Sequence, residues 1–209
     1  MCSGTLILRV PELGFLKCRS SPMERAWARV CREAGGRVRT NVLVSSLNLS
    51  RACSDQRRIE VVVNGLPLFR GRQFAIDCTL VSPLASDGTP RSGCLQRPGK
   101  AMKVAIRKKR RLYRDMVASN RCKLVVAAME VGGRWHAEGY DILRQLARAK
   151  ARTCTPWQAR GVEMATLRRW SGILAAAAQR SYLATLLGLP DDAAETELMT
   201  VAELLDNVP

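Results

Sequence analysis

Two short apolar segments, each interrupted by one acidic residue, constrain this chain more than any other feature. Residues 58–63 and 73–81 are rich in β-branched and aromatic side chains, which favours strands, and an Asn-Gly pair followed by a proline predicts a turn between them. Glu60 lies in the first segment and Asp77 in the second. A carboxylate inside an apolar strand costs folding free energy unless a cation or hydrogen bonds compensate it. The fold must therefore provide a partner for both acids.

The order of the remaining elements predicts an α/β protein. The expected order is a helix opening at Ser20-Ser21-Pro22 and ending at Gly35-Gly36, strands at 37–44, 58–63 and 73–81, a loop at 82–99, a basic helix at 99–118, a strand at 121–131, and helices at 135–151 and 157–188, the last bent near Gly161. This order predicts a central mixed sheet of about four strands, flanked by helices. We expect residues 1–22 to be an irregular segment, 23–188 to be the domain, and 189–209 to be an acidic tail.

The charge balance favours a polyanionic partner. The formal charge is +16 and the pI about 10.3, while 47% hydrophobic residues argue against global disorder. The tail carries 6 of the 18 acidic residues and none of the 34 basic ones, so residues 1–189 have 34 basic and 12 acidic side chains, a net +22. No apolar run approaches the roughly 20 residues that span a bilayer, so no membrane location is expected.

Cysteine and histidine spacing argue against two common kinds of site. The eight cysteines include no C-x-x-C pair, so small buried side chains are favoured over a zinc site. His136 is the only histidine, and it lies where a helix is expected to start. A helix-start or surface role is therefore favoured over a role in a catalytic triad.

Strand periodicity predicts that the two acids lie face to face. In a hairpin with its bend near residues 68–69, Glu60 and Asp77 are opposite one another, with Cβ atoms about 4.5–5.5 Å apart. Two carboxylates at that distance repel unless one is protonated or a cation lies between them, and Mg²⁺ or Mn²⁺ suits such a pair. The same periodicity predicts that Ile59, Val61 and Val63 point away from Glu60.

Two structural alternatives remain open for the acids. Glu60 can pair with Arg57 or Arg58 at the strand end, and backbone amides can hold Asp77.

The basic segment from Lys100 to Lys123 contains ten Lys or Arg residues and one acid. It offers a lysine (Lys108 or Lys109) to stabilise a pentavalent phosphate, and Tyr113 to stack on a base or bond a phosphate oxygen. The residues expected to contact nucleic acid are Lys103, Arg107, Lys108, Arg110, Arg111 and Arg114. The alternatives are a solvated helix face or a nuclear-localisation run at Arg107–Arg111.

Together these motifs resemble the restriction-like endonuclease domain at the C-terminus of site-specific non-LTR retrotransposon polyproteins, which is similar to PD-(D/E)xK nucleases. The matching segments are Arg58-Ile59-Glu60, Ala75-Ile76-Asp77-Cys78-Thr79, the run from Lys103 through Lys108-Lys109 to Tyr113, and Val125 to Gly133. Three departures stand out: Glu60 replaces the usual Asp, Ile59 replaces the usual Pro, and Thr79 stands where related nucleases carry the lysine.

The resemblance implies a restriction-endonuclease-like fold and nicking of target DNA, leaving a 3′-hydroxyl that primes reverse transcription. Glu60 and Asp77 would hold the metal, Lys108 or Lys109 would replace the missing lysine, and Tyr113 would match the family tyrosine. Implied partners are DNA, the element's RNA and a reverse transcriptase domain of the parent polyprotein, and the implied location is the nucleus. Two alternatives are a catalytically inactive nucleic-acid-binding remnant and a basic scaffold that binds RNA.

Overall fold

The computed structural model describes residues 21–49, 56–85 and 88–187. The elements are α2 (Ser21–Glu33), β1 (Arg37–Leu43), η1 (Val44–Ser46), β2 (Arg58–Asn64), η2 (Phe69–Gly71), β3 (Gln73–Val81), α3 (Lys100–Leu112), α4 (Arg114–Val117), β4 (Cys122–Glu130), α5 (Ala137–Ala151) and α6 (Pro156–Leu187). The first helix begins at Ser21, within the predicted opening at Ser20-Ser21-Pro22, so the helical domain starts two residues before the expected boundary at residue 23. The rest of the N-terminal segment and the predicted tail at 189–209 lie outside the described residues.

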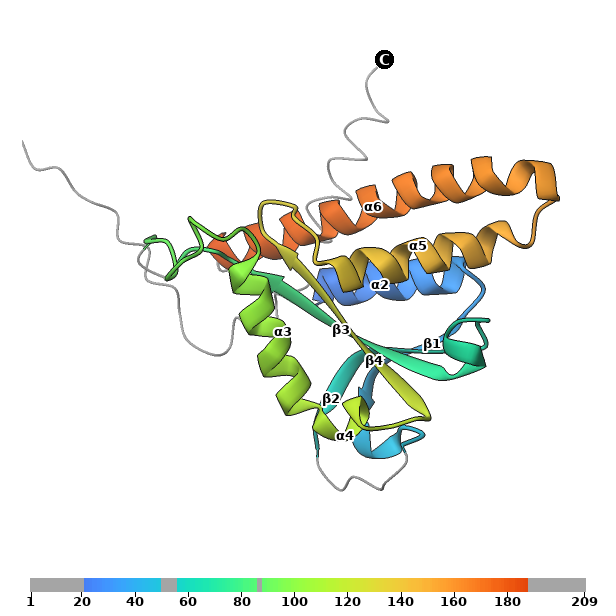
Figure 1. Ribbon diagram of the computed structural model, residues 1–209, viewed down its shortest axis with the longest axis horizontal. Coiled ribbons are helices and arrows are strands. Elements are labelled where there is room, and N and C mark those ends of the chain that lie inside the picture. The colour runs from blue at the N-terminus through green and yellow to red at the C-terminus, as the bar shows by residue number, and fades with distance from the viewer. Residues whose placement is uncertain (1–20, 50–55, 86–87, 188–209) are drawn as a thin grey trace, which may run out of the picture.

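The four strands form one mixed sheet in the order β1-β2-β3-β4 (Figure 1). β1, β2 and β3 pair antiparallel, whereas β3 and β4 pair parallel through the crossover made by α3 and α4. The crossover is needed because neighbouring parallel strands cannot be joined by a tight turn. This confirms the expected α/β architecture of four mixed strands flanked by helices.

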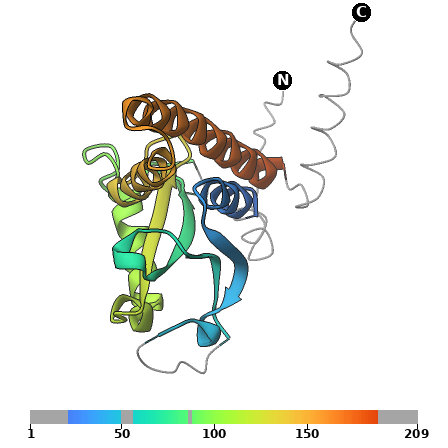
Figure 2. The ribbon, with the colours of Figure 1, turned by 90° about the vertical axis from the view of Figure 1, so that its right-hand side faces the viewer.

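Helices cover both faces of the sheet (Figures 1 and 2). On one face, α2, α5 and α6 enclose a core that contains Trp27, Leu143 and Trp170, while α3 and α4 cover the other face with Met102, Ile106 and Met116. β4 shows how strand alternation supplies both cores. Its residues 125, 127 and 129 enter the first core, and residues 124, 126 and 128 enter the second.

A break or bend near Gly161 was expected in the last helix, and the structure has no break there. α6 is a continuous helix of 32 residues that packs along α5 and α2. Gly161 is exposed, and a Cβ built there would meet nothing within 4 Å. A helical glycine costs about 1 kcal/mol relative to alanine. The packing of Trp170 and Leu174, which are fully buried, outweighs this cost.

Glu33 joins the end of α2 to the middle of α6. Its carboxylate accepts hydrogen bonds from Arg169 at 2.6 Å, from Trp170 Nε1 at 2.7 Å and from Arg29 at 2.9 Å. These bonds lower the pKa of Glu33 to about 2, with the bond from Arg169 as the largest cause. The arrangement gives the indole N–H of a fully buried tryptophan its partner.

The basic segment was expected to be one helix over 99–118, but it is two. α3 ends at Leu112 and the short α4 starts at Arg114, with Tyr113 between them at φ −103° and ψ 44°. The Tyr113 hydroxyl donates a hydrogen bond of 2.8 Å to the carbonyl of Arg58 in β2. This bond fixes Tyr113 against the sheet at the position where the helix bends.

Candidate functional site

Glu60 lies where β2 departs from regular strand geometry. The residues of β1 and β2 pair on both sides of Asn41 and Glu60, but these two residues do not pair with each other. Asn41 has φ 50°, and its carbonyl accepts a hydrogen bond of 2.7 Å from Arg58 instead. The distortion also corrects one sequence prediction: Ile59 packs with Val62 against α3 and α4 rather than with Val61.

The register of β2 and β3 brings the two acids together as the sequence predicted. Val61 is opposite Ile76 and Val62 is opposite Ala75. Glu60 is the next residue of β2 after this register, and the charge of Asp77 helps to raise its pKa, so the two carboxyl groups lie near one another. The proximity of the two acids agrees with the expected hairpin, and their joint binding of a metal stays a prediction.

Asp77 is fully buried, and both its oxygens have partners. Oδ1 lies 2.7 Å from Nζ of Lys109, and Oδ2 accepts a hydrogen bond of 2.7 Å from the Thr79 hydroxyl. The expected alternative, in which backbone amides hold Asp77, is not what the structure has. A lysine from the crossover helix and a hydroxyl from the same strand hold this carboxylate.

Glu60 has no comparable partner among the described residues. Its Oε2 atom is buried and accepts no hydrogen bond from them. The two arginines considered as partners are engaged elsewhere: Arg57 pairs with Asp115 at 2.7 Å, and Arg58 bonds the carbonyl of Asn41. A buried carboxylate oxygen without a donor is the feature that a bound cation or a proton would compensate.

The pKa values of the cluster follow from this geometry. Burial, and then the charge of Asp77, raise the pKa of Glu60 to about 8, with Lys109 acting in the opposite direction. Burial by itself lowers the pKa of Lys109, but the charges of Asp77 and Glu60 outweigh it and raise the pKa overall. Burial therefore favours the protonated form of Glu60, and the two acids favour the charged form of Lys109.

Sequence reasoning missed a third acid near the pair. Glu24, in the first turn of α2, contributes to the raised pKa of Glu60. It also contributes, after burial and the charges of Glu60 and Asp77, to the raised pKa of the buried Cys78 thiol. The only sequence signal was one acid in the first turn of a helix, which is an ordinary position for a carboxylate.

The structure separates the two lysines that the sequence could not distinguish. Lys109 points toward the sheet, with 31% of its side chain exposed, whereas its neighbour Lys108 is exposed on the outside of α3. The other cations expected to contact nucleic acid, which are Lys103, Arg107, Arg110, Arg111 and Arg114, are also exposed. Arg110 is bonded to Glu138 of α5 at 3.0 Å.

Tyr113 lies in the core rather than on the surface. It is 4% exposed, its hydroxyl bonds β2, and the guanidinium of Arg57 lies 5.6 Å from the centre of its ring. This geometry explains the residue as a support for β2 and α3. A contact with a base or phosphate remains a prediction.

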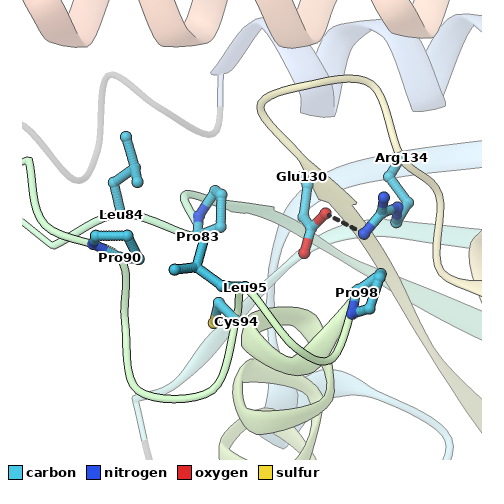
Figure 3. Close-up of a pocket in the computed structure, with 8 residues that line it drawn as sticks. All are labelled: Pro83, Leu84, Pro90, Cys94, Leu95, Pro98, Glu130 and Arg134. Atoms are coloured by element: carbon cyan, nitrogen blue, oxygen red, sulfur yellow. Dashed lines mark ion pairs between the residues drawn. The ribbon is translucent and has the colours of Figure 1, made fainter.

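Two further residues have structural positions. His136 caps α5, accepting a hydrogen bond of 3.3 Å from the amide of Glu138, as its helix-start position predicted. Glu130 pairs with Arg134 at 3.4 Å beside a hollow of about 310 Å³ at the ends of β3 and β4 (Figure 3). In the sheet Glu130 is opposite Val81, four residues beyond Asp77, or about 13 Å along the strand. The hollow and the acidic pair are thus separate places.

The acidic pair fits a hard divalent cation better than a soft one. Within the described residues, no group of three or more His, Cys, Asp and Glu side chains could hold a metal. Two carboxylates are enough for Mg²⁺, which completes its shell with water and phosphate oxygens. The buried Oε2 of Glu60 supplies an oxygen that has no other partner in the described part of the chain.

Comparison with known proteins adds no family assignment. No family model matches this sequence, and no curated protein matches it. In the described part of the chain, no helix combines the length and apolar character needed to cross a bilayer.

Proposed function

We propose that this protein is a divalent-metal-dependent endonuclease that hydrolyses phosphodiester bonds in DNA. The observation that carries the proposal is the convergence of Glu60, Asp77 and Lys109 on adjacent elements, at a place where one carboxylate oxygen is buried without a hydrogen-bond donor from the described residues. A strongly basic chain provides the charge to hold the polyanionic substrate.

The order of elements supports a restriction-endonuclease-like fold for this activity. One helix is followed by three antiparallel strands, and a crossover helix leads to a parallel fourth strand. The resemblance to non-LTR retrotransposon endonucleases extends the proposal to a domain of mobile-element origin. Such a domain would act in the nucleus, nick target DNA and leave a 3′-hydroxyl for reverse transcription.

Each residue of the cluster has a role in this proposal. Glu60 and Asp77 would hold Mg²⁺ or Mn²⁺, which when bound polarises the scissile phosphate and lowers the pKa of a water nucleophile. Thr79 holds the Asp77 carboxylate in orientation. Lys109 is a permanent cation beside both acids, and its ammonium can donate to a phosphate oxygen as negative charge develops there.

The position of Lys109 compensates for the departure at Thr79. In related nucleases the lysine comes from the strand of the second acid, two residues later. Here that position provides a hydroxyl, and the ammonium reaches Asp77 from α3. Lys109, and not Lys108, is therefore the lysine proposed for catalysis.

One observation favours a second candidate, a nucleic-acid-binding protein without catalytic activity. Lys109 already neutralises Asp77 at 2.7 Å, and burial lets Glu60 keep its proton. The cluster can thus be stable without any metal, as expected of an inactive remnant that keeps its basic surface.

A plasmid nicking assay separates the two candidates. Wild-type protein should nick supercoiled DNA with Mg²⁺ or Mn²⁺ but not with chelator. Asp77→Asn should lower the rate at least about 100-fold while DNA binding is kept, because the negative charge that attracts the metal is lost and the cationic surface is not. Asp141→Asn, at an exposed position of α5, is the matched control and should nick like wild type.

The outcome of the assay decides between the two candidates. Nicking by Asp77→Asn at the wild-type rate would contradict the nuclease proposal. Salt-dependent binding without any nicking by wild type would favour the second candidate. A metal-induced rise in melting temperature, absent in Asp77→Asn, gives an independent test of the metal site.

A further inference from the structure

The cations of α3 form a band over the half of the helix that faces away from the sheet. Ala101, Met102 and Ile106 define the inward side because they are the buried residues of α3. At about 100° per residue, the exposed cations occupy the rest of the helix surface in three groups. Lys103, Arg107 and Arg110 lie along one flank, Arg111 faces outward, and Lys108 lies toward the second flank.

Lys109 lies on the inward side of the helix, apart from the first group, and reaches the buried Asp77. It is roughly 120° around the axis from Lys103, counted across the buried side. The bond from Arg110 to Glu138 places the first flank beside α5, whereas Lys109 reaches Asp77 of β3. One helix therefore carries an exposed cationic flank and, roughly 120° around the axis, the proposed catalytic lysine.

This arrangement matches the dimensions of B-form DNA. An α-helix is about 10–12 Å across with its side chains, and the major groove is about 12 Å wide. A helix in that groove has one sugar-phosphate strand on each flank. α3 has 13 residues, or about 20 Å, which is enough to follow the groove over several base pairs.

We infer that α3 enters the major groove of duplex DNA, with Lys103, Arg107 and Arg110 holding the strand that is not cut. The strand to be cut then lies along the other flank, on the side where Lys109 reaches Asp77. Arg111 and Val104 point to the groove floor, where an arginine can bond guanine and an aliphatic side chain can contact thymine methyl groups. The assignment of the two strands rests on the proposed nuclease function, but the groove contact does not.

A B-form DNA duplex fits this arrangement better than an RNA duplex or a single strand. The major groove of A-form RNA is too deep and narrow for side chains to read, so an RNA duplex should bind less well. A single strand offers only one of the two backbones. A B-form DNA duplex should therefore be the preferred ligand.

Binding measurements in chelator test the groove contact without any need for nicking. A 30-base-pair DNA duplex, the RNA duplex of the same sequence and one DNA strand serve as probes. Lys103→Gln with Arg107→Gln should weaken duplex binding about tenfold and reduce the slope of log K against log salt by about 2, because two phosphate contacts are lost. Arg160→Gln with Arg168→Gln, on α6 beyond the opposite face, removes equal charge and should leave the slope nearly unchanged.

Chemical modification of the probe identifies the groove. Methylation of guanine N7 in the major groove should weaken wild-type binding at least about tenfold. Equal affinity for the RNA duplex, indifference to N7 methylation, or no duplex binding at all would each overturn the inference. A major-groove footprint without nicking would instead keep the groove contact and reject the nuclease.

The strand assignment has its own test. Neutral methylphosphonates on the strand opposite the nick should slow nicking by wild type but not further slow the Lys103→Gln, Arg107→Gln variant. If the modification slows both proteins equally, the first flank does not hold that strand.

Discussion

Removing the charge at position 60 should make the metal-free protein more stable at alkaline pH. The folded protein raises the pKa of Glu60 from 4.5 to about 8, mainly by burial. A raised pKa means that the folded state keeps a proton that the unfolded chain has already released. Stability from this group is therefore fully present below pH 4.5 and is lost as the pH rises through about 8.

The size of the effect follows from that interval. Each pH unit between the two pKa values removes about 1.36 kcal/mol from the free energy of unfolding. Wild type should therefore lose about 4–5 kcal/mol of stability from this group between pH 4.5 and 9. Glu60→Gln keeps a neutral side chain of the same shape and has no such loss. Its stability relative to wild type should therefore rise steadily over that range.

Urea unfolding in chelator, at pH 5, 7 and 9, measures the difference. Glu163→Gln, which removes one carboxylate from the ion pair with Arg148, is the control. Its stability should differ from that of wild type by a small and similar amount at every pH. A constant difference between Glu60→Gln and wild type would refute the reasoning, because it would mean that position 60 is not desolvated in the folded state. Adding Mg²⁺ at pH 9 should restore stability to wild type but not to the variant.

Three more substitutions test other parts of the structure. Lys109→Met should lower the free energy of unfolding in urea by about 2–4 kcal/mol, because it leaves Asp77 buried without its cation. Lys108→Met should stay within about 0.5 kcal/mol of wild type. Equal losses would contradict the different burial of the two lysines. Glu33→Gln should cost about 2 kcal/mol at pH 7, and because the folded pKa is lowered to about 2, melting curves should converge with wild type as the pH falls from 4.5 through 2. Tyr113→Phe should lose about 1 kcal/mol of stability and keep the wild-type nicking rate; a large loss of nicking with normal stability would instead support a catalytic role.

The strands and the pairing of the acids could be predicted because both depend on local patterns. Alternating side chains and a turn signal fix which residues of a hairpin lie opposite each other. Glu60 and Asp77 follow from that register alone. Interruption of the alternation at Ile59 could not be foreseen, because it depends on the conformation of Asn41 in a different strand.

The lysine could not be chosen from the sequence. Lys108 and Lys109 are adjacent and have the same chemistry, so only the orientation of α3 on the sheet decides which of them reaches Asp77. That orientation depends on the packing of Met102 and Ile106. Two apolar residues among so many cations do not show, from the sequence alone, which side of the helix faces the sheet. The bend at Tyr113 was missed for a similar reason, since its cause is a hydrogen bond to β2.

The support of Asp77 by two elements has an evolutionary consequence. Its oxygens face position 79 of the strand and position 109 of the crossover helix at the same time. A chain with lysine at both positions would have a spare ammonium, and either one could then be lost without leaving the acid uncompensated. In the proposed nuclease, the cation beside Asp77 could thus move from one position to the other in single viable substitutions, and the usual motif would be lost without loss of the chemistry.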